Sequence, residues 1–305
     1  MNWESLLTSP PPSTGWTLDA TEAVVVHRTA NGELHCAAEE LPDGAFKIGP
    51  VGLQAMDPEV VAPVFARLKG AAEGAQTAAV IVPTGWLRSY LIEIDRVPRK
   101  ESELHDVVRW RLKKLLPVPP TDLRLSVVPL PESGGKRPLL VMAGVERAMA
   151  AVEATFSSIG IEVGLITTRL FAIVPRNVGV GRPTLVIQHE KSFLSLVLLS
   201  EGVPQLLRTK PLAADGDSRG TALGETGLIL GFIRDKLGVE GRIEVKLNCE
   251  DPDVDAALRE WLAAQERLAP APEEVSPPCG PTTVVSRIGA TRIAPAVAVV
   301  MGELR

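Results

Sequence analysis

The chain has 305 residues, a length typical of about two domains. Its formal net charge of −5 gives the molecule no overall attraction for nucleic acid, and its 45% hydrophobic and 23% charged residues are typical of a folded protein. No apolar run approaches the roughly 18 residues of a membrane span, and three widely spaced cysteines indicate neither a disulfide framework nor a zinc site. We therefore expect a soluble protein with reduced thiols and no nucleic-acid partner.

The first 75 residues predict strands followed by a helix. After a Pro- and Ser-rich flexible arm, residues 1–15, two strand-like runs over 16–28 and 33–40 are joined by Asn-Gly, a strong hairpin signal. A helix then begins at Asp57-Pro58, a capping residue and a proline at the first helical position. With residues 161–180, residues 16–75 form the predicted first half of the fold.

Residues 76–160 are predicted to be an inserted α/β subdomain. The pattern predicts strands over 78–82, 86–94, 123–130 and 138–145, and helices over 101–116 and 146–159. A further strand over 161–167 returns the chain to the first half.

Residues 181–305 form the predicted second half. The stretch 184–199 reads TLVIQHEKSFLSLVLL and predicts a hairpin whose polar tip is Gln188–Lys191. The later predicted elements are strands over 205–210, 243–249 and 282–286, helices over 221–237, 251–265 and 288–304, and a Pro-rich loop over 269–281. Because the hairpin-strand-helix plan is repeated, we predict an α/β fold of the duplicated actin-like, ribonuclease-H-like kind, with an α/β insert in the first half.

Residues 80–130 resemble the PilM family of type IV pilus assembly proteins, which are actin-like and related to the cytoplasmic part of the type II secretion protein GspL. The resemblance rests on Pro83-Thr84 after a strand, on Glu103-Leu104 and Trp110 in a helix, and on Pro117-Val118-Pro119 after it. This Pro-x-Pro is expected to end the helix at Leu116, since proline cannot continue it. A weaker resemblance covers most of the chain, including the closing helix IAPAVAVVMGEL.

The turns that hold nucleotide phosphates in actin-like ATPases are altered here. Those turns are tipped by glycines, which let backbone N–H groups approach an anion. The corresponding positions are Asp19 and Thr21 in the first hairpin, Gln188 and His189 in the second, and Asn248 in the third turn, with no glycine among them. We interpret them as vestigial, with Asp19 a turn residue and His189 a solvent-facing one.

The resembled family carries a small helical subdomain, a lid over the nucleotide cleft, between the strand that matches 205–210 and the next helix. Here only PLAADGDSRGTALGE lies between them, which is too short for that subdomain. The second half is therefore reduced. We predict a pseudo-ATPase with no catalytic residues, no metal site and no bound cofactor.

One dense basic cluster occurs in the chain, and its residues are Arg109, Trp110, Arg111, Lys113 and Lys114. Such a run suits the solvated face of an amphipathic helix or a surface for a partner. In the resembled family, an N-terminal peptide of the membrane protein PilN docks between the first half and the insert. The resemblance implies that this helix lies beside that groove and contacts the peptide.

The resemblance thus implies a cytoplasmic scaffold, peripheral at the inner membrane, which binds a PilN-like tail and couples the platform to the motor ATPase. Two alternatives stay open. An ATP-binding PilM would hold ATP and Mg²⁺ with the backbone amides of its degenerate turns. A sugar or acyl kinase of the same fold would need a catalytic Asp in the first half and a substrate loop, and the sequence identifies neither.

Overall fold

The computed structural model describes residues 12–132, 135–174, 182–213, 216–239, 241–270 and 290–302. The chain divides into a first unit, residues 1–173 with 276–305, and a second unit, residues 174–275. Among the described residues, no helix is long and apolar enough to cross a membrane.

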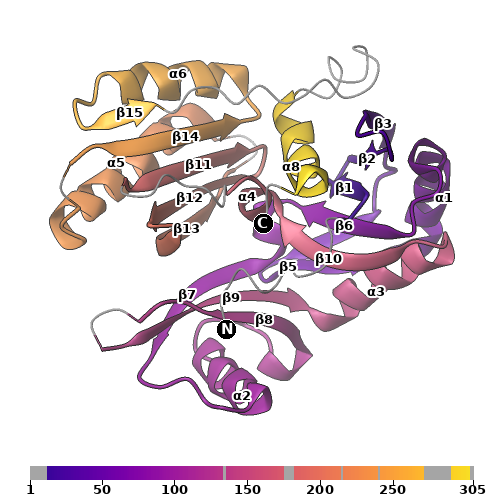
Figure 1. The fold of residues 1–305 in the computed structure, drawn as a ribbon, viewed down its shortest axis with the longest axis horizontal. Coiled ribbons are helices and arrows are strands. Elements are labelled where there is room, and N and C mark those ends of the chain that lie inside the picture. Colours follow the sequence, from indigo (N-terminus) through magenta and orange to yellow (C-terminus); the bar gives the residue numbers. More distant parts are fainter. Residues whose placement is uncertain are drawn as a thin grey trace. The chain divides into compact units, whose positions relative to one another are not determined.

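A five-stranded sheet in the order β10-β6-β1-β2-β3 is the centre of the first unit (Figure 1). Its strands are β1 (Thr14–Leu18), β2 (Glu22–Arg28), β3 (Leu34–Glu40), β6 (Thr77–Val82) and β10 (Glu162–Thr168). The β1-β2-β3 meander is antiparallel, whereas β6 pairs in parallel with both β1 and β10. Every residue of β6 after Thr77 is buried, as expected for a strand that is covered on both faces of its sheet.

Helices cover both faces of this sheet. On one face, α1 (Pro58–Lys69) and α3 (Glu146–Ser158) contribute Phe65 and Phe156, whose rings pack against Trp16 with centroids 5.5 and 5.0 Å away. On the other face lie α4 (Arg169–Ile173) and α8 (Ala290–Met301), and α8 packs apolar side chains against β2 and β6. Asp57 caps α1 as predicted, accepting a hydrogen bond from the Glu59 amide.

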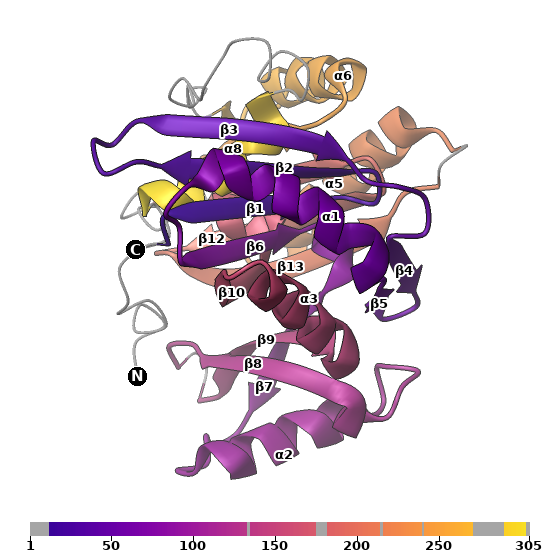
Figure 2. The same cartoon turned by 90° about the vertical axis from the view of Figure 1, so that its right-hand side faces the viewer.

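The insert is an antiparallel sheet in the order β7-β9-β8, with one helix on its outer face. Its elements are β7 (Arg88–Ile94), α2 (Glu101–Leu112), the short η4 turn (Pro120–Asp122), β8 (Leu123–Pro129) and β9 (Arg137–Val145). The buried stripe of α2 consists of Leu104, Val108 and Leu112. Figure 2 shows α2 and α3 on opposite sides of this sheet.

A small hairpin of β4 (Phe46–Gly49) and β5 (Gly52–Met56) lies between the first sheet and the insert, and the sequence does not predict it. It contacts both α3 and the short η3 turn, Thr84–Trp86, that leads into the insert. The Phe46 and Trp86 rings lie 4.7 Å apart between centroids. The hairpin therefore supports the junction between the two parts of the first unit.

The second unit is a five-stranded sheet in the order β13-β12-β11-β14-β15 with two helices on one face. Its elements are β11 (Thr184–Glu190), β12 (Phe193–Ser200), β13 (Val203–Pro211), α5 (Ser218–Lys236), β14 (Ile243–Cys249), α6 (Pro252–Ala263) and β15 (Leu268–Pro270). The core between sheet and helices includes Leu185, Ile187, Leu196, Ile229 and Leu258.

The structure corrects three sequence-based boundaries. Strand β6 was predicted to belong to the insert, but it is the second strand of the central sheet, because it pairs with β1 and β10. Helix α8 was predicted to belong to the second half, but its apolar face covers the first sheet. Helix α2 ends at Leu112, before Leu116, because the following residues tighten into turns. The predicted strand over 282–286 and residues 1–11 of the predicted arm lie outside the described residues.

Candidate functional site

The carboxylate of Asp19, at the first degenerate turn, is paired with a buried cation. The Arg169 guanidinium lies 3.0 Å from Asp19 Oδ2 and also donates to the Leu18 carbonyl oxygen. The Arg169 side chain is only 3% exposed. In the same turn, the Asp19 amide donates to Glu22, and the exposed Thr21 accepts a backbone hydrogen bond from Leu41. The carboxylate of Asp19 therefore has a buried arginine of the same chain as its partner.

Helix α4 brings Arg169 to this position, and the Thr84 hydroxyl helps to hold that helix. The Leu170 amide, in the first turn of α4, donates to Thr84 Oγ1 over 3.3 Å. Sequence reasoning missed Arg169. The available signal was a single arginine between apolar and threonine residues in ITTRLFAIV.

The second hairpin closes later than predicted. Glu190 pairs with Phe193, so the tip is Lys191-Ser192, whereas Gln188, His189 and Glu190 are strand residues at most 2% exposed. The predicted tip and the solvent-facing His189 are therefore wrong. The polar residues 188–190 are typical of a turn by composition, but their register with β12 makes them strand residues with buried side chains.

The His189 imidazole is held by the first residue of α5. His189 Nε2 lies 2.8 Å from Ser218 Oγ. Burial lowers the pKa of His189, while the negative charges of Asp251 and Glu250 oppose that shift. The ring is therefore favoured in its neutral form and fixes the beginning of α5 against the sheet.

Around the third turn, carboxylate side chains of the protein accept hydrogen bonds from backbone N–H groups. The Lys191 amide donates to Glu250 Oε2 over 3.3 Å, and Asp251 Oδ1 accepts from the amides of Asp253 and Val254 at the beginning of α6. Asn248 Nδ2 donates to Gln188 Oε1 over 2.6 Å. The second unit thus brings Gln188, His189 and Asn248 together, whereas Asp19 and Thr21 belong to the first unit. Within the described part of the chain, no group of three His, Cys, Asp or Glu side chains is placed to hold a metal ion.

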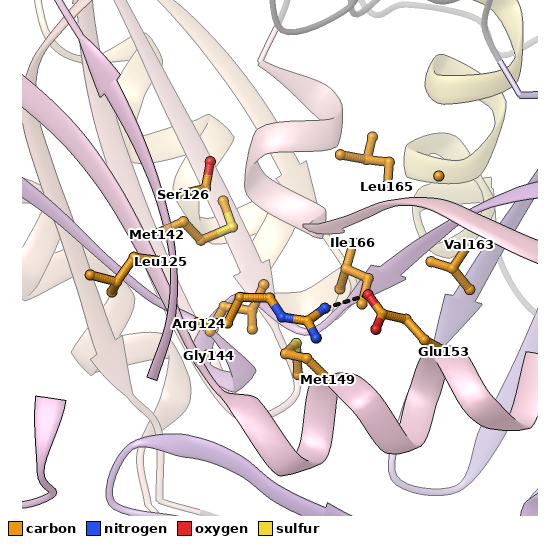
Figure 3. A pocket seen from close by; sticks show the side chains of 12 residues that line it. Arg124, Leu125, Ser126, Met142, Gly144, Met149, Glu153, Val163, Leu165 and Ile166 are labelled. Carbon is orange, nitrogen blue, oxygen red and sulfur yellow. Dashed lines mark hydrogen bonds and ion pairs between the residues drawn. The ribbon is translucent and has the colours of Figure 1, made fainter. Parts of the chain in front are cut away.

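A groove of about 170 Å³ lies in the first unit, between the insert sheet, α3 and β10 (Figure 3). Leu125 and Ser126 of β8, Met142 of β9, Met149 of α3 and Leu165 of β10 are among its lining residues. Strands β8 and β10 are edge strands of their sheets. The groove is therefore apolar over much of its wall and has on each side a strand edge that pairs with no other strand among the described residues.

An ion-pair network gives the groove its polar end. Arg124 donates to both carboxylate oxygens of Glu146, over 3.0 and 2.6 Å, and also to Glu153 on the next turns of α3. This contact with Arg124 holds the pKa of Glu146 below its usual value. Two carboxylates and one guanidinium leave this end with one net negative charge.

The predicted basic cluster lies away from the groove. The groove wall contains Ser126 and its cross-strand partner Met142, whereas the alternate residues Val141 and Ala143 are buried on the face that α2 covers. Since successive strand residues point to opposite faces, α2 lies on the other side of the insert sheet from this groove. Its basic cluster is a separate surface. That the cluster contacts a partner peptide stays a prediction.

Comparisons with known proteins identify the fold of the chain. No protein-family model and no curated protein matches the sequence. The structure resembles a chain of the "PilM-PilN type IV pilus biogenesis complex", at 17% identity and a TM-score of 0.71 over 97% of this chain and 100% of that chain. It also resembles the cytoplasmic domain of EpsL, an inner-membrane component of the type II secretion system of Vibrio cholerae. There the identity is 12% and the TM-score 0.50, over 95% of this chain and 93% of that chain.

A third solved structure is a protein of unknown function with an actin-like ATPase fold from Bacteroides thetaiotaomicron. It is 8% identical, with a TM-score of 0.52 over 87% of this chain and 93% of that chain. Likenesses at these identities concern the fold, and they confirm the resemblance to PilM and GspL at that level. The chain has an actin-like α/β fold.

Proposed function

We propose that the chain is a PilM-like scaffold on the cytoplasmic side of an inner membrane, in a type IV pilus or a related secretion system. It binds the N-terminal tail of a PilN-like protein in the groove of the first unit and connects that platform to a motor ATPase. It does not hydrolyse ATP. The observation that carries the proposal is the groove between two edge strands, in a fold shared with a protein solved in a PilM–PilN complex.

The groove suits an extended peptide. The free edges of β8 and β10 can offer backbone N–H and C=O groups to an added strand. The side chains of Met142, Met149 and Leu165 give flexible apolar walls for the side chains of the peptide. The Arg124–Glu153 pair supplies polar partners at one end (Figure 3).

Ser126→Arg is expected to weaken peptide binding on the order of 30-fold, because the long side chain would occupy space in the groove that the peptide fills. Ser126 is exposed on edge strand β8, so the variant should fold. The measurement is a calorimetric titration of the full chain with a synthetic peptide of the cytoplasmic N-terminus of a PilN-like protein from the same cell. Ser157→Arg, at an exposed position of α3 outside the groove, is the matched control. Absence of binding by the unmodified chain, or equal losses in both variants, would contradict the groove assignment.

The degenerate turns support a scaffold without ATPase activity. Phosphoryl transfer depends on positioned backbone N–H groups and cations around the phosphates. Here Asp19 is paired with Arg169, and Glu250 accepts the Lys191 amide. A phosphate at either turn would have to displace the contact described there, and at the second of them it would bring negative charge beside Glu250.

Titration of the folded chain with ATP and Mg²⁺ is expected to give no heat up to about 1 mM nucleotide, a range that detects even weak binding. The same samples should release no phosphate above a blank. A circular dichroism spectrum and a cooperative melt provide the folding control. Micromolar binding would instead favour an ATP-binding PilM whose turns still present their backbone amides.

A further inference from the structure

The end of α2 and the turn after it form an exposed basic and aromatic surface. We call it the α2 basic end, and it consists of Arg109, Trp110, Arg111, Lys113, Lys114 and Leu115. Trp110 is 59% exposed and Leu115 57% exposed. Since Leu104, Val108 and Leu112 form the buried stripe of the helix, these two apolar side chains project outward with the cations.

The positive charge of this surface is nearly uncompensated. Among the described residues, Arg111, Lys113 and Lys114 form no ion pair, and Arg109 has only the exposed Asp106, 3.7 Å away. The sequence contains no Asp or Glu from residue 107 to residue 121. A strongly positive surface thus occurs on a chain whose net charge is −5.

The indole of Trp110 lies among these cations. The Arg111 guanidinium carbon and Lys114 Nζ each lie 5.4 Å from the centroid of the ring. Such cation–π contacts hold the ring at the surface. An exposed Trp surrounded by Lys and Arg is the chemistry of membrane–water interfaces, where the indole lies at headgroup level and the cations contact anionic headgroups.

We propose that the α2 basic end binds the surface of an anionic phospholipid bilayer, with Trp110 and Leu115 inserted among the headgroups. A bilayer suits this surface better than an acidic peptide does, because Trp110, on the helix, and Leu115, in the turn after it, are both more than half exposed and neither lines the groove described above. The residues that line the groove belong to the insert sheet, α3 and β10, and none belongs to α2, so the groove remains open to a peptide. Figure 2 shows α2 and α3 on opposite sides of that sheet. The proposal therefore stands independently of the peptide-binding function.

The test is co-sedimentation of the full chain with vesicles of phosphatidylcholine containing about 30% phosphatidylglycerol, which gives the surface potential that attracts basic segments. Binding is expected to these vesicles and not to pure phosphatidylcholine, and it should weaken as salt screens the charges. The variant R111Q/K113Q/K114Q should bind about a hundredfold more weakly, at roughly fivefold for each lost cation. W110A should bind these vesicles about tenfold more weakly, because the indole that enters the headgroup region is removed.

The matched control is R219Q/R234Q/K236Q, which removes three exposed cations from α5 and changes the net charge equally. It should bind the anionic vesicles within about twofold of the unmodified chain, because the three cations that it removes lie outside the α2 basic end. Equal binding to neutral vesicles, or equal losses in both triple variants, would overturn the proposal. So would binding of a soluble polyglutamate peptide at the α2 basic end without any binding to vesicles, because the surface would then be a peptide site.

Discussion

Asp19→Ala is expected to lower the free energy of unfolding of the first unit by about 3 kcal/mol, because it leaves a buried guanidinium without its carboxylate. Arg169 is almost wholly buried, and Asp19 is 17% exposed, so solvent cannot replace the lost partner. An aspartate whose only role was to hold Mg²⁺ would behave differently. Its removal would leave the stability of the nucleotide-free protein nearly unchanged.

A double-mutant cycle separates the pair from its surroundings. Denaturant unfolding would be measured for Asp19→Ala, for Arg169→Met and for the double variant. The double variant should be more stable than Asp19→Ala, because a methionine in place of the cation needs no partner. Additive losses in the cycle would contradict a coupled pair.

Gly52→Ala is expected to destabilise the first unit by about 3 kcal/mol or more, through backbone strain and overpacking together. Gly52 has φ +97°, and a Cβ there would lie 2.1 Å from the carbonyl oxygen of Trp86. That oxygen belongs to the main chain at the entrance to the insert, so it cannot rotate away as a side chain would. The substitution would push the β4–β5 hairpin off this junction.

Gly32→Ala is the control for the backbone conformation alone. Gly32 has φ +84°, but nothing lies within 4 Å of an added Cβ. It should cost about 1 kcal/mol, the usual penalty for an L-residue in a left-handed conformation. Thermal or urea unfolding of the two variants measures the difference, and equal losses would show that close approach to Trp86 is not the cause.

Local patterns predict much of the fold. The Asp-Pro pairs at residues 57–58 and 251–252 mark the beginnings of α1 and α6, where each aspartate accepts amide hydrogen bonds. Asn31-Gly32 lies between β2 and β3 as predicted. These features depend on neighbours within a few residues, so the sequence contains enough information to place them.

The features that sequence reasoning missed depend on residues far apart in the chain. The position of His189 follows from the β11–β12 register and from Ser218, which is 29 residues away. Arg169 donates a hydrogen bond to Asp19, which lies 150 residues earlier in the sequence. The placement of α2 away from the groove follows from which face of the insert sheet it covers, and its own periodicity contains no information on that choice.

The contact of α8 with the first sheet has a consequence for biosynthesis. When residues 1–275 have left the ribosome, every strand of the second unit has been made, but Val24, Val26 and Ile81 still lack the helix that covers them. The first unit is complete only after residues 290–301 are released, so this apolar sheet face is covered by α4 alone, and only in part, through the last stage of synthesis. Translation that stops before α8 therefore yields a chain prone to aggregate and in need of a chaperone.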